Sequence, residues 1–98
     1  MNKLEVDVTE LLIKTIPCAE SARFGKNGAD VTTIAVRIAR AASGRDNIAI
    51  CGYHGWHDWY LATNLKNKKN LDQHLLSNLK TEGVPNFLKN SVFQFSYN

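Results

Sequence analysis

The chain has little of several residue types, and each shortage narrows what it can be. No stretch approaches the roughly 20 consecutive apolar residues of a transmembrane helix, so we expect no membrane partner. Residues 1–3 lead into an amphipathic pattern rather than into the apolar block of a signal peptide. Cys18 and Cys51 are the 2 cysteines, too few for a disulfide framework, and we expect both to be small buried thiols in a reducing compartment. These shortages predict a cytoplasmic protein.

The chain also has few charged residues: they make up 21% of it, and the formal net charge is +3. Much of the positive excess lies in Lys66, Lys68 and Lys69, which form a run rather than a patterned face. We interpret this run as a solvated loop and expect no nucleic-acid partner. Hydrophobic residues make up 44% of the 98 residues, which is typical of a globular protein with one domain at most.

Two segments have the spacing of amphipathic helices. In residues 3–15, apolar side chains recur every three or four positions, and Pro17 follows the pattern and ends it. A second apolar stripe runs from Val31 to Ala42, and Gly44 supplies the expected C-terminal stop. Both segments should therefore be helices that cover a sheet.

Three segments predict strands: residues 19–24, 48–51 and 92–97. The second is continuously apolar, as expected of a strand buried on both faces of a parallel sheet. The first two strands and the helix between them would make a right-handed βαβ unit. Elsewhere we expect a helical turn at 56–62 and a short helix at 71–79. The fold class is therefore α/β, with a mainly parallel sheet and flanking helices.

The start of the second helix is a candidate anion site. Asn27, Gly28 and Ala29 open this helix, and the N–H groups of a first turn lie unpaired at the positive end of the helix dipole. Gly28 lets an anion approach the backbone closely. In an open parallel sheet, ligands bind outside the carboxyl ends of the strands, so residues 51–53 should face the same crevice. One ligand could touch both segments.

The stretch from Phe24 to Gly55, FGKNGADVTTIAVRIARAASGRDNIAICGYHG, resembles the cofactor-phosphate region of class III aminotransferases. These are pyridoxal-phosphate (PLP) enzymes of fold type I, and the glutamate-1-semialdehyde aminomutase-like members are the most similar. The match is the ordered set of an Asn-Gly-led helix, a helical Ala-Val-Arg-Ile-Ala-Arg, a Ser-Gly-Arg, an apolar strand and a Tyr-His-Gly turn. The resemblance implies that residues 1–98 form a single partial PLP-binding large domain, an N-proximal fragment.

The resemblance also implies roles for four residues. Gly28 and Ala29 match the pair whose backbone N–H groups hold the cofactor phosphate. Tyr53 matches the aromatic residue that stacks on the pyridine ring, and His54 beside it is expected to line the same pocket. Ala29 replaces the usual Ser or Thr, which removes a hydroxyl contact but keeps the backbone donor. Asp30 stands where the family usually has Glu, and the sequence leaves the effect of this change open.

The family's cofactor-binding lysine has no counterpart, because none of the chain's lysines stands in a matching context. We therefore expect the chain alone to be inactive. The resemblance implies a parent enzyme that is a homodimer and transfers an amino group between a small-molecule donor and acceptor. The alternative is a small non-enzymatic α/β domain that binds a phosphate ligand or an interaction partner.

A metal site is the remaining possibility, because Cys51, His54 and His57 follow the pattern C-x-x-H-x-x-H. Thiolate and imidazole suit zinc, but this spacing does not fit one face of a helix, and only three ligands are available. We therefore expect no metal.

Overall fold

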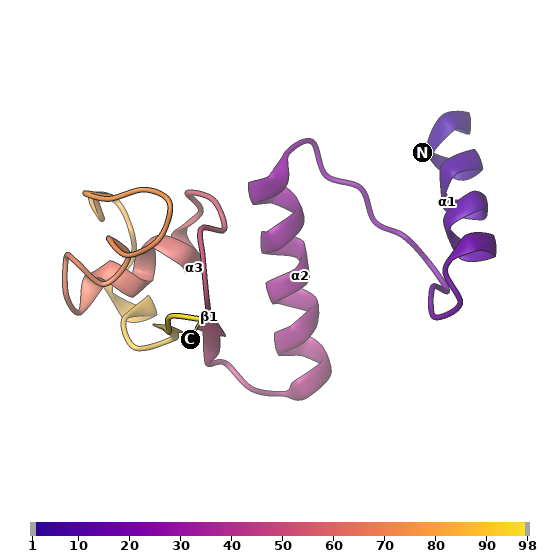
Figure 1. Cartoon of the computed structure of the whole chain (residues 1–98). Helices are drawn as coiled ribbons and strands as arrows, with labels where there is room; N and C mark the ends of the chain where they lie inside the picture. Colours follow the sequence, from indigo (N-terminus) through magenta and orange to yellow (C-terminus); the bar gives the residue numbers. More distant parts are fainter. Residues whose placement is uncertain (1, 98) are drawn as a thin grey trace.

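The computed structural model describes residues 2–97, and Figure 1 shows the order of their elements. The two strands pair in parallel, with Ile48 opposite Val92 and Ile50 opposite Gln94. This arrangement confirms the α/β class with a parallel sheet and flanking helices. The elements are the helices α1 (Lys3–Thr15), α2 (Gly28–Ser43) and α3 (Asp58–Leu61), the 3-10 helices η1 (Ala62–Leu65) and η2 (Asn86–Leu88), and the strands β1 (Ile48–Ile50) and β2 (Val92–Gln94).

Helix α1 confirms the first predicted helix but lies apart from the rest of the chain (Figure 1). It begins after Asn2, whose side-chain oxygen accepts the N–H of Glu5 at 2.9 Å, and it ends at Thr15, followed by the C-cap Ile16 and then Pro17. None of residues 3–15 is buried. The radius of gyration is 15.9 Å, compared with about 13 Å for a compact chain of this length. Helix α1 therefore adds little to the core.

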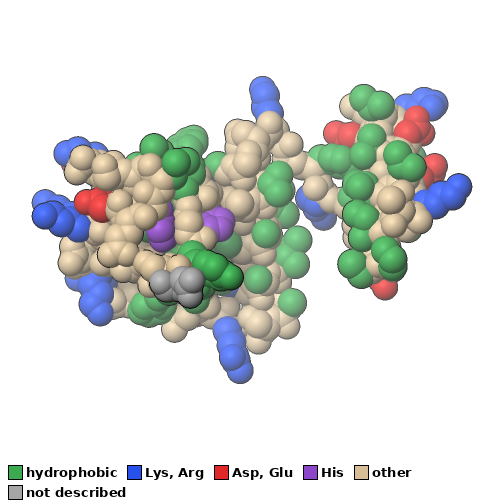
Figure 2. Space-filling model, viewed as in Figure 1, with side chains coloured by type: hydrophobic (Ala, Val, Ile, Leu, Met, Phe, Trp, Pro, Cys, Tyr) green, Lys and Arg blue, Asp and Glu red, His purple; other side chains and the backbone are tan. Residues whose placement is uncertain are grey.

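Helix α2 confirms the second predicted helix and is capped at both ends. The side-chain oxygen of Asn27 accepts the N–H of Asp30 at 2.9 Å, and Gly44 follows the last turn in the left-handed conformation with φ 68°. Figure 2 shows hydrophobic side chains uncovered on both α1 and α2. Ile38 is 57% exposed, so the apolar stripe of α2 is only partly covered by the chain's own residues.

The predicted strand over residues 19–24 is wrong, and so is the βαβ unit built on it. The segment is extended but has no neighbouring strand among residues 2–97, and a strand exists only when its backbone pairs with another. The parallel pair is formed instead by β1 and β2, which are joined through α3. Ile50 is buried whereas Ala49 is exposed, so β1 is covered on one face and not on both.

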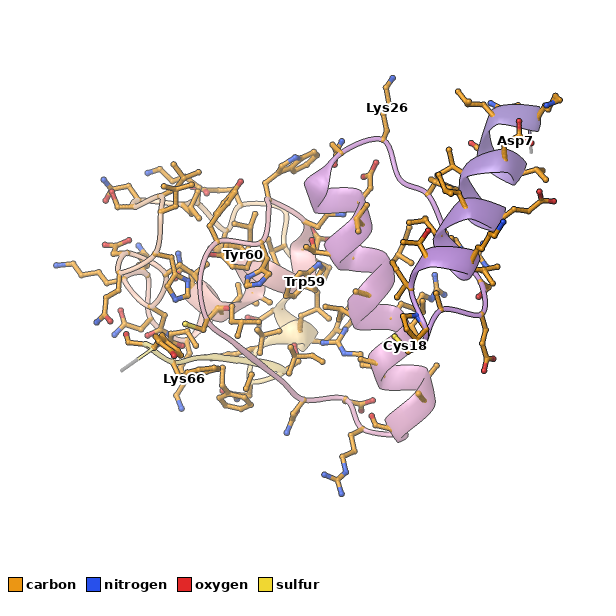
Figure 3. The ribbon with its side chains drawn as sticks, turned by 45° about the vertical axis from the view of Figure 1, so that its right-hand side comes forward. Asp7, Cys18, Lys26, Trp59, Tyr60 and Lys66 are labelled. Atoms are coloured by element: carbon orange, nitrogen blue, oxygen red, sulfur yellow. The ribbon has the colours of Figure 1, made fainter. Side chains whose placement is uncertain are left out.

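The core lies where the sheet meets α3. Ile50 and Val92 from the sheet, Trp59 and Tyr60 from α3, and Leu71 form one cluster, and each is at most 6% exposed. Helix α3 confirms the helical turn predicted at residues 56–62. Figure 3 shows both of its aromatic side chains inside the body formed by α2, the sheet and the loops. This cluster supports the segment that follows β1.

The predicted helix over residues 71–79 is wrong, because the segment consists of turns, bends and irregular backbone. The buried side chain of Asn64 accepts the N–H of Leu71 at 2.9 Å and donates to the carbonyl oxygen of Leu79 at 3.2 Å. Asn78 has φ 58°, a left-handed conformation that cannot continue an α-helix. A single amide side chain therefore replaces the helical hydrogen bonds at both ends of the segment.

The two cysteines differ in burial. Cys51 is half-buried, whereas Cys18 is exposed, so the prediction of two buried thiols is wrong. Cys18 lies in the turn that follows α1, which is closed by the hydrogen bond from the N–H of Ala19 to the carbonyl oxygen of Ile16 at 3.0 Å. Within residues 2–97, no helix combines the length and the apolar character needed to cross a membrane.

Candidate functional site

A pocket of about 480 Å³ lies between the start of α2 and the turn that follows β1. Residues 27–29 and Thr32 line one side, and residues 53–56 line the other. The four residues predicted to bind a cofactor are all part of this lining: Gly28, Ala29, Tyr53 and His54. The structure therefore brings together the two segments that the sequence assigned to one ligand.

Two N–H groups at the start of α2 have no hydrogen-bond partner within residues 2–97. Asn27 accepts the N–H of Asp30 through its side chain, and the N–H of Val31 through its carbonyl oxygen at 3.2 Å. The N–H groups of Gly28 and Ala29 precede these two and remain unpaired. A Cβ built on Gly28 would meet no atom within 4 Å, so the space beside it is open. The helix can therefore donate two backbone hydrogen bonds to an anion and add the effect of its dipole.

Two contacts seat the turn after β1 on α2. The hydroxyl of Thr32 donates to the carbonyl oxygen of His54 at 2.8 Å. Gly55 has φ +107°, and a Cβ there would lie only 2.6 Å from the Cβ of Ala29. Gly55 is therefore required both by its backbone conformation and by the close approach of the helix. These contacts set the width of the pocket.

Tyr53 and His54 form the wall that faces the helix start. The half-buried ring of Tyr53 packs edge-on against Tyr60, with centroids 5.5 Å apart. Nδ1 of His54 lies 2.9 Å from the carbonyl oxygen of Gly52. A carbonyl only accepts, so Nδ1 carries a proton, and in the neutral ring Nε2 is then an acceptor. Burial, followed by the effect of Tyr53, raises the pKa of Tyr60 to about 12, so Tyr60 is a neutral support for this wall.

Asp30, whose role the sequence left open, faces His57. Its carboxylate oxygen Oδ1 lies 3.4 Å from Nε2 of His57, the residue that precedes α3. The pair ties the first turn of α2 to the segment that carries Trp56. No local pattern could reveal this contact, because it joins residues distant in sequence. The part of the chain that the structure describes holds no group of three or more His, Cys, Asp or Glu side chains suited to a metal ion.

His74 is the second residue near the site that sequence reasoning missed. Its Nε2 lies 3.3 Å from the backbone nitrogen of Gly52, and its Nδ1 lies 3.2 Å from the hydroxyl of Tyr60. His74 belongs to the loop that was predicted as a helix, where an isolated histidine gives no sign of its partners. It connects the residue before Tyr53 to the core.

Comparison with known proteins identifies relatives of the chain, although no family model matches it. A 3-aminobutyryl-CoA aminotransferase from Cloacimonas acidaminovorans is 34% identical over 97 residues, which cover 99% of this chain and 19% of the relative. A glutamate-1-semialdehyde 2,1-aminomutase from Methanothermobacter thermautotrophicus is 46% identical over 59 residues, which cover 58% of this chain and 14% of the relative. These matches support a fragment that is similar to aminotransferases over nearly its whole length and to an aminomutase over more than half of it.

A solved structure supports the same assignment. An omega-transaminase from Sphaerobacter thermophilus matches with a TM-score of 0.68 and 26% identity, over 99% of this chain and 23% of that one. The resemblance found in residues 24–55 is thereby confirmed. The chain spans less than a quarter of the length of each of these three relatives. It therefore matches one segment of an aminotransferase.

Proposed function

We propose that the chain is the phosphate-binding part of the large domain of a PLP-dependent class III aminotransferase or aminomutase. The observation that carries this proposal is the pair of unpartnered N–H groups on Gly28 and Ala29, which line the same pocket as the Tyr53 ring. A phosphate monoester needs several hydrogen-bond donors and a positive field, and the start of a helix supplies both. An aromatic ring beside that anion suits a planar cofactor.

The open space and the polar groups of the pocket support the binding of PLP. The open space beside Gly28 allows a phosphate to reach the backbone, and Ala29 adds no side-chain group that would block it. His54 presents Nε2 as an acceptor on the same wall as Tyr53. When bound, PLP supplies an electron sink for reactions at an amino-bearing carbon. The chain's own residues would hold the phosphate and orient the ring.

The wider function follows from the relatives and is proposed with the binding role. Among the described residues that line the pocket, none is a lysine. Lys26, the nearest in sequence, points outward from the loop before α2 (Figure 3). We therefore expect the chain alone not to transfer amino groups. The parent enzyme would be a cytoplasmic homodimer acting on a small-molecule amino donor and acceptor.

Gly28→Pro is the sharpest test of the phosphate contact, because it deletes one N–H group and preserves the helix. Gly28 is the first residue of α2, where proline is well accommodated. Asn27 has φ −149° and ψ 174°, the extended conformation that a residue before proline requires. A hydrogen bond to a charged group contributes about 1.5–3 kcal/mol, so PLP affinity should fall about tenfold to a hundredfold.

Gly28→Ala is the matched variant, since it keeps the N–H group but adds a methyl group to the space through which the phosphate would approach. It tests that space alone, so its loss of affinity should be smaller than that of Gly28→Pro, which also lacks the N–H group. The 98-residue chain would be titrated with PLP, pyridoxal and inorganic phosphate, with tryptophan fluorescence as the signal and circular dichroism to verify helix content. Equal losses in both variants, or equal binding of pyridoxal and PLP, would contradict the proposal. Equal binding of phosphate and PLP would favour a non-enzymatic phosphate-binding domain.

A further inference from the structure

His74 links the turn that forms the pocket wall to the core of the chain. The N–H of Gly52 donates to Nε2 of His74 at 3.3 Å, and Nδ1 of the same ring lies 3.2 Å from the hydroxyl of Tyr60. Gly52 directly precedes Tyr53 and has φ +99°. The ring therefore spans the distance between the start of the turn and a fully buried tyrosine.

These two partners determine where the ring carries its proton. A backbone N–H can only donate, so Nε2 of His74 must present a lone pair to Gly52. The single proton of the neutral ring then lies on Nδ1 and is donated to the hydroxyl oxygen of Tyr60. A second proton would have to go onto Nε2, where it would face another donor. Protonation of His74 therefore breaks the hydrogen bond that holds Gly52.

We infer that His74 is a positioning residue for the pocket, and that its neutral form holds the turn of residues 52–55 in the geometry that binds ligand. Protonation releases Gly52 and loosens the wall that carries Tyr53 and His54. The effect on ligand affinity rests on the proposed function, whereas the hold on Gly52 does not. The hydrogen bond from Gly52 to His74 is fully formed where His74 is neutral, and it is lost as the pH falls.

Three titratable side chains lie around His74. Tyr60 on α3 contacts its ring, His54 packs against Tyr60 and contacts the carbonyl oxygen of the same Gly52, and Asp72 lies two residues before it on its own loop. The carboxylate of Asp72 accepts the N–H of Asn78 at 3.1 Å. Neither of the two ion pairs found in residues 2–97 includes His74. The measurements should therefore span about pH 5 to about pH 8, the range in which a histidine side chain can change charge.

His74→Gln separates positioning from titration. An amide side chain can accept from Gly52 and donate to Tyr60, and it carries no charge at any pH in this range. Two readouts apply to the 98-residue chain: the amide NMR signal of Gly52 without ligand, and the affinity for PLP. In the unaltered chain, the Gly52 signal should shift with the same midpoint as the ring signals of His74. In His74→Gln the change with that midpoint should be absent, which separates it from any change caused by His54 at the carbonyl oxygen of Gly52.

The PLP measurement uses the variant as its reference, because the phosphate of PLP itself titrates near pH 6. Loss of one neutral hydrogen bond should reduce the affinity of the unaltered chain, relative to His74→Gln, by about fivefold between about pH 8 and about pH 5. His57→Gln is the control for the Gly52 signal, since His57 pairs with Asp30 and not with Gly52. In this variant the Gly52 signal should still shift with the midpoint of His74.

The outcomes distinguish the two proposals. A Gly52 signal that titrates in His74→Gln as it does in the unaltered chain overturns the positioning role. PLP binding with the same pH dependence in both proteins overturns the link to ligand affinity and leaves the proposed function intact. A Gly52 signal that follows His74 in a chain that binds no PLP supports the positioning role and contradicts the proposed function. The shared midpoint in the unaltered chain tests the hold on Gly52 even if the variant does not fold.

Discussion

Replacing Gly55 by alanine tests directly how the pocket's two walls meet. Gly55 has φ +107°, a conformation that residues with a Cβ rarely adopt. A Cβ there would lie 2.6 Å from the Cβ of Ala29 and 2.9 Å from its Cα. Neither atom can move without shifting the first turn of α2. The substitution should therefore both destabilise the chain and displace the turn that carries Tyr53.

The expected loss has two parts. A non-glycine residue held in an unfavourable backbone conformation costs about 1–3 kcal/mol. Forcing a methyl group against a helix costs a similar amount, about 1–3 kcal/mol, because the neighbours must shift or strain. The sum for Gly55→Ala is about 2–6 kcal/mol, against a total stability of about 5–15 kcal/mol for a chain of this size. The variant should unfold at a clearly lower denaturant concentration.

Gly83→Ala is the matched control, because Gly83 has φ +87° and a Cβ there would meet no atom within 4 Å. It carries the backbone cost without the overlap. Chemical denaturation followed by tryptophan fluorescence gives the free energy of unfolding of both variants. The difference between them, about 1–3 kcal/mol, measures the contact with Ala29. Adding Ala29→Gly to Gly55→Ala should recover part of that difference, since it removes the closest atom.

The reasoning is refuted if Gly55→Ala is no less stable than Gly83→Ala. The turn would then not lie against the start of α2, and the pocket between them would have a different shape. PLP affinity provides an independent check, because Gly83 lies away from the pocket lining. Gly83→Ala should bind PLP as the unaltered chain does, whereas Gly55→Ala should bind it more weakly.

Three further substitutions test the support around the site. Thr33→Val removes the hydroxyl that accepts the indole N–H of Trp59 at 2.9 Å. Because this buried donor is then unpaired, the free energy of unfolding by denaturant should fall by about 1–3 kcal/mol. A loss below about 0.5 kcal/mol would contradict the contact. Asn64→Ala removes two hydrogen bonds to the loop at residues 71–79, so stability should fall by about 2–4 kcal/mol and amide exchange in that loop should accelerate; unchanged exchange would refute its role. The pKa of Tyr60 is about 12 in the folded chain against an ordinary 10.0. Because the unfolded chain releases this proton at a lower pH, the contribution of Tyr60 to the free energy of unfolding is complete below pH 10 and is lost as the pH rises toward 12, by up to about 3 kcal/mol. Tyr60→Phe should abolish this alkaline loss in unfolding curves, and an equal loss in the variant would assign it to another group.

The parts of the fold that the sequence could predict are those that depend on neighbouring residues. The helices α1 and α2 follow from apolar spacing and from end signals such as Asn27 and Gly44, all of which lie within the elements or next to them. The strand β1 follows from its apolar run. The predicted strand at residues 19–24 failed because pairing depends on a partner strand, and none lies beside it among residues 2–97. The predicted helix at residues 71–79 failed because Asn64, outside the segment, binds its backbone.

The candidate site likewise has features that the sequence could predict and contacts that it could not. The meeting of Gly28 and Tyr53 in one pocket was predictable, because a helix start and a strand end share the same edge of a parallel sheet. The contacts that hold this geometry were not predictable. Asp30 with His57, and His74 with Gly52, join residues with no common periodicity, and each becomes visible only when the loops are folded.

The size of the core explains why these individual contacts matter for binding. With α1 unburied and the sheet limited to two strands, the body around the pocket is stabilised by a small cluster beside α3. Burial alone therefore does little to determine how far the turn stands from the helix. That distance depends on Thr32, Gly55 and His74, two of which act through single hydrogen bonds. A change at Thr32 or His74 removes about 1 kcal/mol of a local constraint, enough to alter a pocket while the chain stays folded. Ligand affinity should consequently respond to such changes more strongly than global stability does.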